Sequence, residues 1–185
     1  MRFFDRVRLL KASFALVFFT ALSGCCGLSV PSGLQAVRSF EVDRYLGLWY
    51  EVARLDHSFE RGLSDVTAMY VSRPDGGIDV INRGFHEEDG KWSEVRGVAY
   101  FLEGRQTASL KVSFFRPFYC GYHVLKIDPG YNYAVVSGAD RTALWILARK
   151  PSIPHDMLAE LYHFARQAGF PTDELIEVKH SRHKS

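Results

Sequence analysis

Short runs of alternating apolar and polar residues, separated by turn signals, dominate the sequence beyond residue 45. Such alternation is typical of half-buried antiparallel strands. Between the runs stand segments such as Asp75-Gly76-Gly77 and Pro129-Gly130, which favour tight hairpins. Consecutive hairpins predict an all-β fold, an eight-stranded antiparallel up-and-down barrel whose closure removes exposed edges. The runs span residues 48–55, 66–72, 78–86, 93–101, 108–115, 121–128, 133–138 and 143–150.

One amphipathic helix is expected after the eighth run. Apolar residues recur at helical spacing from His155 to Ala168, and Gly169 follows as a stop signal. We expect this helix to pack against the outside of the barrel. Residues 175–178 fit a short final strand, and the basic residues after it are expected to form a solvated terminus.

Charged residues indicate which face of each strand points into the barrel. Asp79 and Arg83 are four residues apart in one strand and therefore point to the same face, which we expect to face water. The alternate residues then face the interior. Several interior positions are Gly or Ala, which predicts an apolar cavity able to hold one small ligand. The predicted lining comprises Ala68, Tyr70, Val80, Asn82, Val95, Gly97, Ala99, Leu110, Val112 and Phe114.

The N-terminus has the pattern of an exported, lipid-modified protein. A basic segment precedes an uncharged apolar run at 12–22, which is too short to span a bilayer but suits a signal peptide. Leu22-Ser23-Gly24-Cys25 follows and resembles the bacterial lipobox. We therefore expect a signal peptide at 1–24, lipid attachment at Cys25, a short tether at 25–33 and a single domain at 34–185. The residue after Cys25 is Cys26 rather than Asp, which by resemblance to the enteric sorting rule indicates the outer membrane, with the domain facing the periplasm.

The formal net charge of +2 does not indicate nucleic-acid binding, because the excess of basic residues lies in the predicted signal peptide.

Two cysteines, Cys26 and Cys120, remain after lipidation of Cys25, and a disulfide between them is left open. No metal site is predicted, because Cys and His lack ligand spacing. Cys120 is a weak candidate for a catalytic nucleophile, with His123 as its general base. We favour the interpretation that Cys120 is a small residue at the start of a strand.

Three segments together resemble the lipocalin family. Residues 47–54 (GLWYEVAR) match its opening GxWYE motif, residues 144–149 (LWILAR) match its third motif, and residues 128–131 match its second motif loosely. The likeness extends over residues 40–150 and implies the same barrel. It also implies that Gly47, Trp49 and Arg149 are structural, with Arg149 packed over Trp49 at the closed end.

The same resemblance fixes the direction of two further strands. Arg149 pointing inward adds Trp145 to the predicted lining, and Trp49 pointing inward places Glu51 and Ala53 inside. An inward Glu51 either meets a polar headgroup or belongs to a closed-end network, and we favour the network. A cation such as Arg54 or Arg116 is available to meet a phosphate, although a solvated surface arginine is more common.

The resemblance implies a binding protein that is not an enzyme and needs no cofactor. The expected ligands are fatty acids or lysophospholipids, stored or transported in the cell envelope by a protein held to the membrane through its N-terminal lipid anchor. A homodimer is compatible with the sequence. Two alternatives stay open. A lipocalin-fold enzyme needs an inward nucleophile and base, and a non-binding envelope assembly lipoprotein should have a barrel filled with large side chains.

Overall fold

The structure is a computed structural model that describes residues 27–182. The predicted signal peptide at 1–24, the predicted lipid-attachment residue Cys25, and Cys26 lie outside the described residues. Among residues 27–182, no helix has the length and apolar character needed to cross a membrane.

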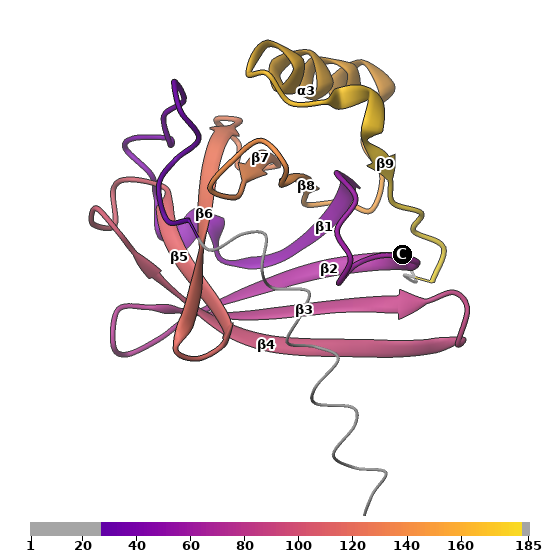
Figure 1. Ribbon diagram of the computed structural model, residues 1–185, viewed down its shortest axis with the longest axis horizontal. Helices are drawn as coiled ribbons and strands as arrows, with labels where there is room; N and C mark the ends of the chain where they lie inside the picture. The colour runs from indigo at the N-terminus through magenta and orange to yellow at the C-terminus, as the bar shows by residue number, and fades with distance from the viewer. Residues whose placement is uncertain (1–26, 183–185) are drawn as a thin grey trace, which may run out of the picture.

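Within the described residues, nine strands form one antiparallel sheet that closes on itself, because β1 pairs with β2 as well as with β8. The first eight run up and down in chain order, which confirms the predicted barrel (Figure 1). A ninth strand lies where the sequence indicated a short final strand, and the structure pairs it with β1. The strands are β1 (Gly47–Arg54), β2 (Leu63–Ser72), β3 (Ile78–His86), β4 (Lys91–Phe101), β5 (Ser109–Phe115), β6 (Phe118–Ile127), β7 (Tyr133–Ser137), β8 (Leu144–Ala148) and β9 (Ile176–Glu177).

The predicted helix, α3 (His155–Gln167), packs on the outside of the barrel. Its buried Leu161 and Ala165 belong to one apolar cluster with Leu144 and Ile146 of β8. Figure 1 shows α3 above β7 and β8. Two short elements were not predicted: α2 (Val42–Tyr45), which precedes β1, and the 3-10 helix η1 (Thr172–Glu174).

The strand register places the predicted lining on one face of the sheet. Directly paired residues in an antiparallel sheet point to the same side. One such row joins Trp49 to Ala68, Asn82 and Val95. Parallel rows place seven other predicted residues on this face: Tyr70 with Val80 and Gly97, Ala99 with Val112, Leu110 with Phe101, and Trp145 with Val136. Phe114 lies at a register shift, and its ring reaches this face beside Gly97.

A β-bulge in β1 changes which side chains enter the barrel. The pairing of β1 with β8 shifts register between Glu51 and Ala53. Ala53, predicted to face inward, therefore lies in the apolar cluster beneath α3. Arg54 turns inward instead and is 2% exposed. The prediction for Ala53 is wrong because strict alternation fails where a bulge adds a residue.

The pairing of β4 with β5 is shorter than its pairing with β3. Hydrogen-bonded pairing of β3 with β4 continues to His86 and Lys91, whereas pairing of β4 with β5 stops at Val98 and Ser113. The end of β4 that begins at Lys91 therefore has no pairing on its β5 side. Figure 1 shows β4 running on past the β5–β6 hairpin.

The segment expected to be a tether packs against the barrel in its described part. The carbonyl of Gly27 accepts a hydrogen bond from the backbone N–H of Gly121 at 2.8 Å. Pro31 is fully buried, and the carbonyl of Ser32 accepts a hydrogen bond from Arg141. Residues 27–32 are therefore part of the folded domain.

The basic C-terminus also differs from the expected solvated tail. The side chain of Asp65, which is fully buried, accepts hydrogen bonds from the backbone N–H groups of Ser181 and Arg182. Arg182 forms ion pairs with Asp65 and Glu87 and lies over the ring of Phe85. Docking of the tail supplies hydrogen-bond donors to this buried carboxylate, which a buried charge needs.

Candidate ligand-binding site

The closed end of the barrel is built around Trp49, which is fully buried. The Arg149 guanidinium lies 3.9 Å from the centre of its ring, and the indole N–H donates to the carbonyl of Tyr45. Gly47 has φ of +90°, a conformation that favours glycine. The structure thus places Trp49 and Arg149 in contact at the closed end, where the family resemblance implies structural roles for Gly47, Trp49 and Arg149.

The lower interior of the barrel is a packed core. The hydroxyls of Tyr45 and Tyr70 both hydrogen-bond to that of Tyr122, at 2.5 and 2.7 Å. Burial raises the pKa of Tyr70 to about 12. Five of the predicted lining residues are buried in this cluster, namely Ala68, Tyr70, Val80, Ala99 and Leu110. Two more, Val112 and Trp145, pack against it and are partly buried.

The upper interior is open. Val95 belongs to the inner-face row of Trp49 yet is 41% exposed, and Phe114 is 40% exposed. Asn82, next to Val95 in the register, is half-buried, and its Oδ1 is buried without a hydrogen-bond partner among the described residues. Space for a ligand is therefore expected near the mouth of the barrel rather than at its floor.

A buried group of charged side chains occupies the β1 side of the mouth. The Arg54 guanidinium forms an ion pair with Glu51 at 2.8 Å, and both side chains are nearly inaccessible. Arg54 also donates to the carbonyl of Glu60, whose carboxylate accepts a hydrogen bond from the Trp145 indole. Glu51 is thus part of a protein network, as favoured, but this network lies at the open end of β1.

The two carboxylates of this group share one cation. Burial, reinforced by the neighbouring Glu60, raises the pKa of Glu51 well above its ordinary value, while Arg54 opposes the rise. Burial also raises the pKa of Glu60. The sequence suggested Arg54 as a rim or surface cation; only the bulge in β1 and the folding of the β1–β2 loop bring it inside. Its charge is already matched by carboxylates.

The β1–β2 loop covers this side of the mouth. The His57 ring contacts Trp145 with ring centres 4.8 Å apart and planes tilted by 31°, and the Phe59 ring stacks on His57. Burial lowers the pKa of His57. Phe59 remains 54% exposed.

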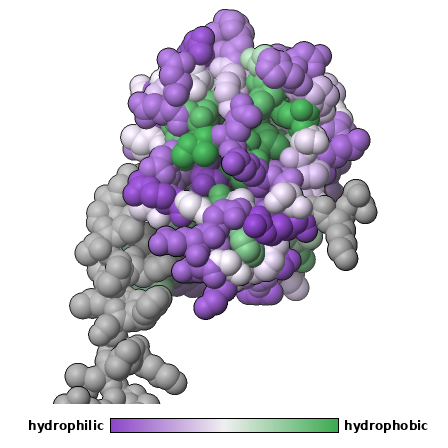
Figure 2. All heavy atoms as spheres, turned by 90° about the vertical axis from the view of Figure 1, so that its right-hand side faces the viewer, coloured by the Kyte–Doolittle hydropathy of each residue, from purple (hydrophilic) through white to green (hydrophobic). Residues whose placement is uncertain are grey.

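Figure 2 shows the face of the molecule that lies on the right-hand side of Figure 1. On this face, hydrophobic side chains form separate patches bordered by hydrophilic ones.

The candidate nucleophile and base point to opposite sides of β6. Cys120 pairs with Val112 on the inner face, whereas His123 pairs with Ser109 on the outer face. The His123 ring is fully buried there, and its Nδ1 lies 3.0 Å from Ser109 Oγ. The structure therefore does not bring Cys120 and His123 together. Within residues 27–182, no group of three or more His, Cys, Asp or Glu side chains is arranged to hold a metal ion.

Comparison with known proteins gives consistent matches. The model of the Lipocalin-like domain family matches residues 40–180. "Outer membrane lipoprotein Blc" of Vibrio cholerae is 48% identical over 171 residues, covering 92% of this chain and 99% of the relative. The protein of that name from Escherichia coli K12 is 44% identical over 179 residues, covering 97% of this chain and 98% of the relative. Apolipoprotein D of Mus musculus is 30% identical over 173 residues, covering 89% of each.

Solved structures agree on the fold. Insecticyanin from the tobacco hornworm Manduca sexta superposes with a TM-score of 0.66 at 16% identity, covering 84% of this chain and 89% of that one. Cockroach allergen Per a 4 gives a TM-score of 0.65 at 16% identity, covering 84% of this chain and 97% of that one. At such identity the likeness concerns the barrel alone. With a family match over most of its length and relatives similar from end to end, this chain belongs to the lipocalin family.

Proposed function

We propose that this lipocalin binds single-chain lipids, fatty acids or lysophospholipids, in the upper part of its barrel and stores or carries them in the cell envelope. The observation that carries the proposal is the exposure of Val95 and Phe114 beside an otherwise packed interior. Large apolar side chains exposed within a concave site are favourably covered by a hydrocarbon chain. Each buried methylene contributes about 0.8 kcal/mol.

The proposed location follows from the lipobox and the relatives. An acylated Cys25 would anchor the chain stably if more than one acyl group were attached. Similar full-length relatives carry the name outer membrane lipoprotein, which supports the same location here. With Cys26 after the lipid-bearing residue, we place the domain on the periplasmic side of the outer membrane. Homodimerisation stays a prediction.

The alternatives are less well supported. Catalysis by Cys120 and His123 is disfavoured because the two side chains lie on opposite faces of β6. The tyrosine cluster fills the floor, which is the feature expected of a non-binding barrel. It does not extend to Val95 and Phe114, so we favour ligand binding.

A titration tests the proposed function. The chain from residue 25, with Cys25→Ser to prevent acylation, is delipidated and titrated with a fluorescent fatty acid. We expect saturable 1:1 binding that unlabelled oleate and oleoyl lysophospholipid reverse. Unsaturable partitioning, or no binding, would support the non-binding alternative. Release of a hydrolysed or oxidised product during incubation would support an enzyme.

A further inference from the structure

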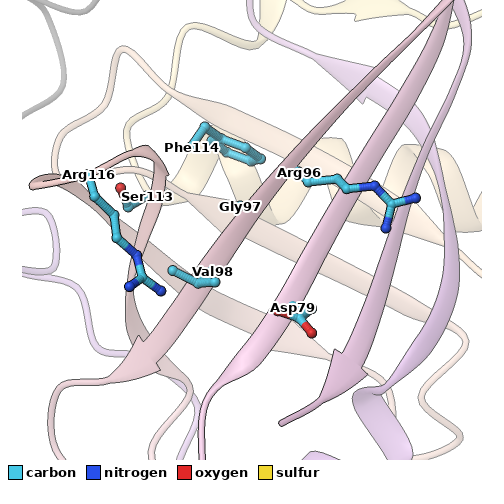
Figure 3. Close-up of a pocket in the computed structure, with 7 residues that line it drawn as sticks. All are labelled: Asp79, Arg96, Gly97, Val98, Ser113, Phe114 and Arg116. Atoms are coloured by element: carbon cyan, nitrogen blue, oxygen red, sulfur yellow. The ribbon is translucent and has the colours of Figure 1, made fainter.

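A cavity of about 220 Å³ lies where the pairing of β4 with β5 ends, beside the β5–β6 hairpin (Figure 3). Gly97 contributes from the inner face, and the Phe114 ring lies against the side on which a Gly97 side chain would stand. Asp79, Val98 and Ser113 contribute from the outer face, because they are paired with one another in the alternate rows. The lining therefore includes residues of both faces of the sheet, and we call this cavity the wall slot.

The size of the wall slot limits what it can hold. Pockets for drug-sized ligands usually measure about 300–1,000 Å³, so this one suits a polar group rather than a whole lipid. A Cβ on residue 97 would lie 2.6 Å from the carbonyl oxygen of Ser113 and 2.7 Å from the Phe114 ring. Glycine at this position therefore allows the close approach of β5 and keeps additional atoms out of the slot.

The charges around the wall slot leave one cation unmatched. Arg96 is paired with Glu94 at 2.8 Å, and Asp79 is paired with Arg73 at 2.6 Å. Arg116 is exposed and forms no hydrogen bond or ion pair among the described residues. In Figure 3 its side chain extends from the β5–β6 hairpin toward Val98, while Arg96 points away over the neighbouring strands. The slot therefore has a surplus positive charge on its outer side.

Ser113 supplies a second, independent observation. Ser113 is 3% exposed, and its Oγ has no hydrogen-bond partner among residues 27–182. Buried hydroxyls are normally hydrogen-bonded, because leaving one unpaired sacrifices its interaction with water. Ser113 lines the slot, so an oxygen atom of a bound group there would satisfy this donor.

We propose that the wall slot binds the anionic head of a single-chain lipid, a phosphate or a carboxylate. The head accepts hydrogen bonds from the Arg116 guanidinium and from Ser113 Oγ, and the acyl chain passes Phe114 to the interior. This assignment rests on the proposed lipid binding and specifies the class of lipid. Other cations of the mouth fit less well: Arg54 is matched by Glu51, and Arg61 is bound to Asp56.

Two lipids with the same oleoyl chain test the slot. Oleoyl lysophosphatidic acid is anionic, and monooleoylglycerol is uncharged. We expect Arg116→Ala to weaken binding of the anionic lipid about tenfold, the size of one lost charge-assisted hydrogen bond, and to leave monooleoylglycerol unchanged. Ser113→Ala should weaken binding of the anionic lipid by a smaller factor. Arg61→Ala at the β1–β2 loop and Arg105→Ala at the closed end are matched controls expected to change neither affinity.

The outcomes separate this inference from the proposed function. If the unmodified protein binds neither lipid, lipid binding itself is wrong. If it binds both and Arg116→Ala changes nothing, lipid binding stands and the wall slot is not the head site. Inorganic phosphate at millimolar concentration should not displace the anionic lipid. Displacement by phosphate alone would assign the slot to the free ion.

A cross-linking experiment needs no variant. A lysophospholipid with a photoreactive group in its head is bound to the unmodified chain and irradiated, and the labelled peptides are identified by mass spectrometry. We expect labels in the hairpin at residues 113–118. Labels confined to the β1–β2 loop at residues 55–62 would show that the head leaves through the mouth and would overturn the proposal.

Discussion

Arg149 lies over the indole of Trp49, with its guanidinium carbon 3.9 Å from the ring centre, and so joins the chain after β8 to β1. The guanidinium also donates to the carbonyls of Arg44, Leu46 and Leu48. These carbonyls belong to α2, to the residue between α2 and β1, and to the start of β1. One side chain therefore satisfies several acceptors and covers the floor of the barrel.

Replacing this side chain should reduce stability. We expect Arg149→Ala to lower the free energy of unfolding by about 1–3 kcal/mol, through loss of the cation–π contact and of the hydrogen bonds. Chemical denaturation measures the change. Lys150→Ala, which alters the adjacent exposed cation, should have little effect. Equal stability of Arg149→Ala and the unmodified protein would contradict the assigned role.

Bulk added to the inner face should compete with the ligand. Val112 is partly buried and pairs with Ala99 on this face, whereas Lys111 lies on the opposite parity. We expect Val112→Trp to weaken fatty-acid binding with the fold retained, and Lys111→Trp to leave affinity nearly unchanged. Fluorescence titration and circular dichroism measure both. The reverse result would mean that the ligand contacts the other face.

The buried ion pair should make the effect of one substitution depend on pH. Arg54→Met leaves Glu51 and Glu60 without their cation, which should cost about 3–5 kcal/mol at pH 7.5. Both carboxyls have raised pKa values in the folded protein, so acidification protonates them before it protonates their unfolded counterparts. The deficit should therefore shrink at pH 5. Arg61→Met is the exposed control, and a deficit independent of pH would rule out this explanation.

Docking of the C-terminus should contribute stability that is lost in acid. Burial alone would raise the pKa of Asp65, but hydrogen bonds from Arg182 and Ser181 lower it to about 2. A carboxyl with a lowered folded pKa stabilises the protein above its unfolded pKa of about 4 and ceases to do so as pH falls to about 2.

Asp65→Asn should therefore cost about 2 kcal/mol at pH 7 and progressively less between pH 4 and pH 2. Unfolding experiments across this range measure it, and Glu88→Gln is a nearby exposed control. A constant difference over the whole range would show that the carboxylate charge is not responsible.

Lipid attachment is testable on the protein from its native membrane. We expect mass spectrometry to find an acylated Cys25 as the first residue, because Leu22-Ser23-Gly24-Cys25 follows the apolar run. Cys25→Ser should abolish the modification and release the chain from the membrane fraction. An unmodified chain that begins at another residue would contradict the prediction.

The sequence by itself determined the barrel, the outside helix and the inner face of most strands. These features depend on local periodicity: a period of two places Val80, Asn82 and their partners on one side, and charges such as Asp79 and Arg83 identify the wet side. The separation of Cys120 from His123 was seen only in the structure, although residues three apart on a strand face opposite ways. The pairing of Trp49 with Arg149 came from family resemblance.

Only the tertiary structure decided where the regular pattern stops. The bulge that turns Arg54 inward depends on how β1 meets β8, and the docking of Arg182 depends on Asp65, 117 residues away. The wall slot lies where the pairing of β4 with β5 ends at Val98 and Ser113, and neither strand alone sets this end point. Register shifts and ion pairs between distant segments are set by packing of the whole chain, and local residue patterns carry no record of it.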